Sequence, residues 1–73
     1  MIDQDRAREI ALQAVDGFVA MPPGTPVTAE RRDDRFVVTI GSGPPPGVRG
    51  ADYQARITVD ANSGEVLELL FGS

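Results

Sequence analysis

Four side chains that carry oxygen atoms, Asp60, Asn62, Ser63 and Glu65, fall within six residues near the end of the sequence. Oxygen atoms of these kinds are the ligands that Ca²⁺ prefers in proteins. A calcium loop of the EF-hand type also needs several more ligands, a glycine at its middle and a distant bidentate glutamate, none of which fits this segment. Because Asp and Asn side chains hydrogen-bond their own turn and Gly64 supports a positive φ, we expect a structural turn without a metal ion.

Other residues of catalytic types lack the partners that the chemistry requires. Paired carboxylates occur at Asp33 and Asp34 and at Glu65 and Glu68, but acid–base catalysis needs two carboxyl groups held in a cleft. Ser42 lies between two glycines, and the chain has no histidine or lysine to accept its proton. Histidine is also the commonest general base and transition-metal ligand. We therefore expect a protein that is not an enzyme and binds no cofactor.

The size and charge of the chain limit the kinds of protein that it can be. The chain has 73 residues, and a chain of this size buries only about 60% of its unfolded surface, so we expect residues 1–73 to form a single domain with a thin core. The net charge of −4 comes from 11 acidic residues against 7 arginines, which argues against a nucleic-acid partner. No apolar run approaches the length of a membrane helix, about 18 residues, so we expect no membrane insertion.

The first part of the chain predicts an amphipathic helix over residues 4–18. Its apolar residues recur at steps of three and four, the period of a helix with one buried stripe. These residues are Ile2, Ala7, Ile10, Ala11, Ala14, Val15 and Phe18. Asp3 is the expected N-cap, and Asp5 places a negative charge near the positive end of the helix dipole. Gly17 and Ala20 are alternative end points, because two prolines follow.

Alternation of apolar and polar residues predicts four strands. They cover residues 27–31, 36–40, 53–60 and 66–71. The connection between the first two strands lacks the glycine of a tight turn, which favours a connection of three to five residues. Residues 41–52 contain seven glycines and prolines and predict one long exposed loop.

The apolar positions of the helix and the strands define one core and, with it, the fold class. We expect the helix to lie across the sheet and to share a core with it. The residues expected in this core are Ile10, Val15, Phe36, Val38, Ile57, Val59, Leu67 and Leu69. The resulting domain belongs to the α+β class and has two layers, with one N-terminal helix packed on a four-stranded antiparallel sheet.

The last two expected strands and the turn between them carry a family motif. The segment Val59-Asp60-Ala61-Asn62-Ser63-Gly64 resembles the Val-Asp-Ala-x-Thr-Gly pattern of the PepSY domain, with Ser63 in the place of threonine. With the N-terminal helix, the resemblance covers nearly the whole chain. It implies an inhibitory or regulatory interaction module of the kind attached to peptidases and membrane proteins. The loop over residues 41–52 is longer than the usual PepSY connection.

Three functions are compatible with these features. The first is a non-catalytic module that restrains or modulates a protein partner such as a peptidase. The chain, which begins Met-Ile, is also similar to small bacterial immunity proteins that neutralise a toxin in the cytoplasm. The third is a small-ligand-binding domain with a pocket between helix and sheet. We expect a cytoplasmic location if Met1 is the native start, and export if the chain is an excised domain.

Two surfaces are candidate protein interfaces. A helix covers only one face of a two-layer fold, and contiguous apolar area on the other face usually marks an interaction site. Alternation assigns Val37, Val66 and Leu70 to the uncovered face, with Arg56 and Glu68 beside them. We expect this face to bind the natural partner or to form a homodimer, with Leu70 near its centre. The second candidate is a possible polyproline II ridge in the long loop, formed by Pro44, Pro45, Pro46 and Arg49.

Overall fold

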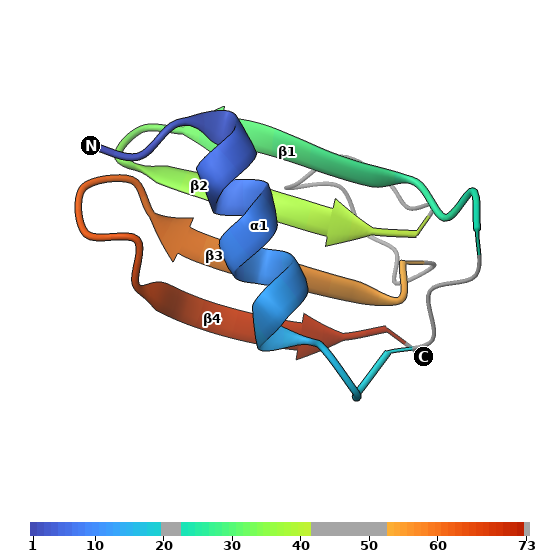
Figure 1. Ribbon diagram of the computed structural model, residues 1–73. Coiled ribbons are helices and arrows are strands. Elements are labelled where there is room, and N and C mark those ends of the chain that lie inside the picture. Colours follow the sequence, from blue (N-terminus) through green and yellow to red (C-terminus); the bar gives the residue numbers. More distant parts are fainter. Residues whose placement is uncertain (20–22, 42–52, 73) are drawn as a thin grey trace.

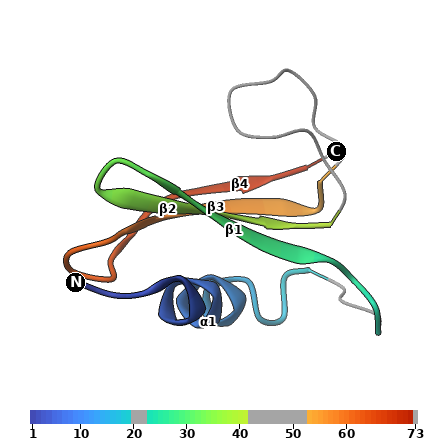
Figure 2. The ribbon, with the colours of Figure 1, turned by 90° about the horizontal axis from the view of Figure 1, so that it is seen from above.

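The protein is one helix packed on one face of a four-stranded sheet, which confirms the expected α+β arrangement. The computed structural model describes residues 1–19, 23–41 and 53–72. The elements follow the order α1, β1, β2, β3 and β4 along the chain, and the strands lie in that same order across an antiparallel sheet. Figure 1 shows α1 crossing the sheet obliquely, and Figure 2 shows the two layers from the side. The loop residues Pro44, Pro45, Pro46 and Arg49 lie outside the described residues.

Helix α1 spans Gln4–Ala14 and is shorter than predicted. Its start is as expected, because the Asp3 side chain accepts a hydrogen bond from the Arg6 amide and Asp5 occupies the first turn. Residues 15–18 form turns instead of a last helical turn, and Gly17 has a φ of 84°. Only glycine adopts such a conformation without strain, so the chain leaves the helix before Phe18 can join the buried stripe.

The strands are β1 at Val27–Arg32, β2 at Arg35–Ile40, β3 at Ala55–Asp60 and β4 at Val66–Phe71. The first connection is tighter than expected, because Arg32 pairs with Arg35 and only two residues form the loop. Asp33 takes the positive φ of 57° that this loop requires, a conformation that aspartate tolerates better than most residues. The guanidinium of Arg31 donates to the Asp33 carbonyl at 3.0 Å and supports the turn.

The pairing of β3 with β4 contains one irregularity that changes which side chains face the helix. Thr58 pairs with Glu68, whereas its neighbour Val59 pairs with Val66, so that Leu67 is an extra residue without a partner on β3. Such a bulge shifts the phase of the strand by one residue. Val66 therefore lies opposite the buried Val59, on the helix side of the sheet. The prediction that Val66 belongs to the uncovered face is wrong.

The core lies between α1 and the first three strands. Val15, Phe36, Val38, Ile57 and Val59 are buried as predicted, and Ile10 packs against them while partly exposed. Small residues, Ala7 and Ala11, form the buried side of the helix, which lets α1 approach the sheet closely.

Leu67 and Leu69 depart from the predicted core, because they are 45% and 37% exposed. The helix packs mainly against β1, β2 and β3, and β4 is the last strand at the edge of the sheet. The helix-facing side of β4 is therefore only partly covered.

Candidate protein interface

The polar turn between β3 and β4 uses its side chains for its own structure. The Asp60 carboxylate accepts hydrogen bonds from the amides of Asn62 and Ser63 at 2.7 and 3.2 Å. The Ser63 hydroxyl accepts from the amide of Glu65 at 3.2 Å, and Gly64 has a φ of 79°. These contacts are those of an Asx turn closed by a glycine. The hydrogen bonds of the turn are those predicted for a structural role of its side chains. Among the described residues, no group of three or more acidic side chains lies close enough to hold a metal ion.

A hollow of about 410 Å³ lies along the outside of α1, not between helix and sheet. Its lining residues all belong to the helix or to the turn after it: Asp5, Arg8, Glu9, Leu12, Gln13 and Asp16. Two of these residues, Arg8 and Asp5, form an ion pair at 3.5 Å. An open hollow on one helix lacks the enclosing walls of a small-molecule site. It therefore offers little support for the hypothesis of a small-ligand-binding domain.

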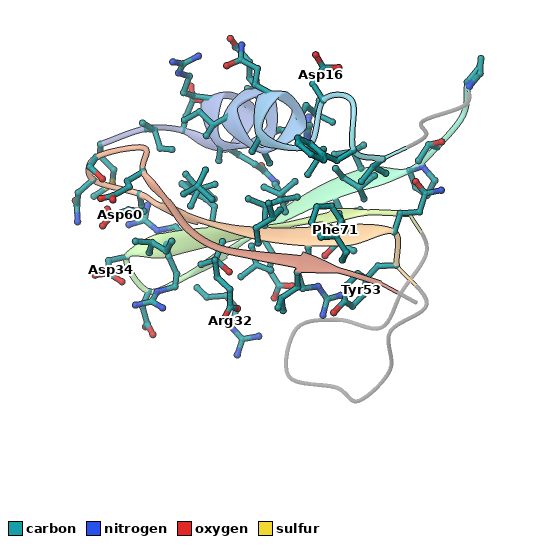
Figure 3. All side chains as sticks on the ribbon, turned by 90° about the horizontal axis from the view of Figure 1, so that it is seen from below. Asp16, Arg32, Asp34, Tyr53, Asp60 and Phe71 are labelled. Atoms are coloured by element: carbon teal, nitrogen blue, oxygen red, sulfur yellow. The ribbon has the colours of Figure 1, made fainter. Side chains whose placement is uncertain are left out.

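The sheet face opposite the helix is more polar than the sequence predicted. Arg56 donates to the Thr39 hydroxyl at 3.0 Å, and its guanidinium lies 4.4 Å from the centre of the Tyr53 ring. Figure 3 shows Tyr53 on this side of the sheet. The strand register places Val37 and Leu70 on the same face, where Val37 pairs with Thr58 and Leu70 pairs with Arg56. Because Val66 lies on the helix side instead, this face has less apolar area than predicted.

The exposed apolar residues of the described chain concentrate on one strand instead. Five of the six residues of β4 are apolar and at least 37% exposed, namely Val66, Leu67, Leu69, Leu70 and Phe71. Figure 3 shows Phe71 on the helix side of β4, beneath α1. Phe18, in the turn that follows the helix, is 77% exposed. Contiguous exposed apolar area of this kind usually marks an interaction site.

The backbone of β4 is also available for pairing. The Gly72 amide donates to the Gln54 carbonyl at 2.9 Å, which identifies this position as a hydrogen-bonded pair. Such pairs alternate along an antiparallel ladder, so Leu70 and Glu68 also direct their amides and carbonyls toward β3. The amides and carbonyls of Leu69 and Phe71 therefore point outward from the sheet, where no other described strand lies.

The opposite edge of the sheet, strand β1, is protected. The Gly41 amide donates to the Pro26 carbonyl at 2.8 Å, and the same alternation turns the Ala29 carbonyl outward. The Gln4 side chain donates to that carbonyl at 2.5 Å. Glu30, Arg31 and Arg32 also place charges on β1, and charge is the usual means by which proteins block strand addition at an edge. Among the described strands, the sheet therefore has one partly protected edge, β1, and one open edge, β4.

The charge of the open edge differs from that of the rest of the sheet. Strands β1, β2 and β3 each carry at least one arginine, whereas β4 carries Glu68 and no basic residue. Glu65 precedes the strand and is exposed. The open edge is therefore apolar and weakly acidic.

Sequence reasoning identified Leu70 and Glu68 but missed Leu67, Leu69 and Phe71 as surface residues. The signal that could have found them is position: β4 is the last strand of a sheet with consecutive hairpins, and such a strand lies at an edge. The high apolar content of β4 favoured a prediction of burial, so its exposure at the edge of the sheet was not predicted.

No protein-family model, curated protein or solved structure matches the chain. Within the described residues, no helix has the length and apolar character to cross a membrane. The function therefore has to be argued from the physical properties of the open edge.

Proposed function

We propose that the protein is a non-catalytic interaction module that takes up an extended segment of a protein partner along the open edge of β4. The observation that carries this proposal is the coincidence of free backbone groups and exposed apolar side chains at Leu69 and Phe71. Strand addition uses both: main-chain hydrogen bonds supply affinity, and alternate side chains supply specificity. A protein strand satisfies both requirements.

The side chains of β4 indicate what the partner segment contains. Leu69 and Phe71 face the helix side, and Leu70 and Glu68 face the other side. An added strand would place apolar residues beside each of these rows. A basic residue opposite Glu68 would fit the acidic character of the edge, because opposite charges on neighbouring strands attract.

The resemblance to PepSY domains suggests what the interaction achieves. The segment that carries the resemblance forms the end of β3 and the turn that leads into β4. A regulatory module of this kind would restrain its partner, such as a peptidase, by holding a segment of it in extended form.

The proposal is tested by blocking the open edge without disturbing the fold. Leu69→Pro removes an outward amide that no described strand uses, and proline is tolerated at such positions of edge strands. Ala29→Pro is the matched control, since the Ala29 amide points outward from the opposite edge. Both variants should retain the circular-dichroism spectrum of the parent protein.

Each protein is then used as bait in the cells that produce it, with quantitative mass spectrometry of what it captures. A specific partner should be retained by the parent and by Ala29→Pro and lost by Leu69→Pro. Retention of the same partner by a folded Leu69→Pro variant would show that β4 is not the binding element.

A further inference from the structure

The open edge of β4 is complementary to itself. Two copies can pair their β4 strands in antiparallel fashion about a two-fold axis, provided that the outward residues of one copy meet those of the other. A register centred on Leu70 achieves this: Leu69 of each copy lies opposite Phe71 of the other, and both residues direct their backbone groups outward. We propose that the chain forms a homodimer by this β4–β4 pairing, which joins the two sheets into one.

The side chains favour this register over its neighbour. With the axis at Leu70, the leucine meets its own copy on the face opposite the helix, and Leu69 and Phe71 form apolar pairs on the helix face. Glu68 then lies opposite Gly72 of the second copy, far from the other Glu68. An axis at Leu69 would instead make the two Glu68 residues diagonal neighbours, about 7–8 Å apart, and would involve the irregular position Leu67. The charge arrangement thus selects the register centred on Leu70.

The other edge makes the assembly close at two copies. Strand addition at both edges would produce an open chain of sheets. Here the Ala29 carbonyl on β1 is already bonded to Gln4, and the charged residues Glu30, Arg31 and Arg32 follow it. Among the described strands β4 is therefore the edge that favours pairing, and pairing of two copies through it uses that edge in both.

The area of contact indicates a dimer of modest affinity. A standard stable interface covers about 800 Å² on each partner, and one strand of six residues, whose five apolar residues are 37% to 53% exposed, offers less. We therefore expect the dimer to dissociate on dilution. This inference rests on the proposed function, because the dimer and the partner complex would use the same edge of β4. A second copy and a partner segment would therefore exclude each other.

The two-fold axis gives a charge-swap test. Leu70 is 42% exposed on the face opposite the helix, so Leu70→Lys and Leu70→Glu should both fold. Each variant alone should sediment as a monomer at concentrations where the parent protein shows twice the chain mass of 7.8 kDa, because like charges would meet at the axis. An equimolar mixture of the two variants should recover the dimer, since lysine then faces glutamate. If the mixture stays monomeric while the parent dimerises, the axis does not lie at Leu70.

The proline variants distinguish a dimer formed by pairing of the β4 edges from a dimer formed by stacking of the sheet faces. Leu69→Pro should be monomeric, and Ala29→Pro should dimerise like the parent. Amide exchange at Leu69 and Phe71 should slow as the parent concentration rises and stay fast in Leu70→Lys. A parent that remains monomeric up to millimolar concentration, or a folded Leu69→Pro that still dimerises, overturns the inference. Partner capture by a parent protein that stays monomeric, lost in Leu69→Pro, would leave the proposed function in place and reject the dimer alone.

Discussion

Replacing Ile57 and Leu69 by alanine, one at a time, tests whether β4 is as exposed as the structure shows. The two residues are cross-strand partners on the same face of the sheet, and both substitutions remove the same number of carbon atoms. Ile57 is fully buried, whereas Leu69 is 37% exposed. The comparison therefore removes three carbon atoms in each case, at two very different levels of burial.

The expected losses of stability follow from that difference. Transfer of the removed carbons from a buried site to water costs about 2 kcal/mol at roughly 0.8 kcal/mol per CH₂ group, and the cavity raises the cost of Ile57→Ala to about 2–5 kcal/mol. Leu69→Ala opens no closed cavity, and part of its side chain is already in water, so we expect about 1 kcal/mol. A domain of this length has a free energy of unfolding of only about 4–11 kcal/mol, which makes the larger loss severe.

Urea denaturation followed by circular dichroism, at a concentration where the chain is monomeric, measures both losses. The Ile57→Ala midpoint should fall by several times the change seen for Leu69→Ala. Equal losses would show that Leu69 is part of the core, and the open edge would then lose its apolar surface.

Three other substitutions and one addition test the turns. Asp33→Gly should raise the free energy of unfolding by about 0.5 kcal/mol, because Asp33 holds a positive φ that glycine adopts more easily; Asp34→Gly is the control and should give no gain. Gly41→Ala should lower the free energy of unfolding by more than about 1 kcal/mol, and by more than Gly17→Ala does. Both glycines have a positive φ, but only at Gly41 would the new Cβ lie 3.0 Å from a backbone atom, the Gln54 nitrogen. Asp60→Ala should cost about 1–2 kcal/mol in a thermal melt, because two amides lose their acceptor. Millimolar calcium should leave the melting temperature of the parent unchanged, since only a ligand that binds the folded state raises it; a rise of several degrees would contradict the structural role of the Asp60 carboxylate.

Local patterns in the sequence were sufficient for the elements and most of the core. The cap at Asp3 and the stripe containing Ala7 and Ala11 predict the start and the buried side of the helix, because both depend on residues within one or two turns. Strict alternation in β3 predicts its buried residues, because side chains of a strand alternate between faces whatever the rest of the chain does. The turn after β3 is likewise determined by its own side chains.

Tertiary structure decided which of the apolar residues stay in water. Alternation shows that Leu67, Leu69 and Phe71 are apolar, but it cannot show that α1 lies mainly over the first three strands. Burial depends on the length and path of the helix, and these follow from the exit at Gly17 and from packing with residues distant in sequence. The bulge at Leu67 is a further case, because it arises from the pairing of two strands and moves Val66 to the opposite face. The candidate interface therefore results from the strand order, the strand register and the part of the sheet that the helix covers. None of these is a property of β4 alone, and for this physical reason the sequence predicted the strand but not the open edge.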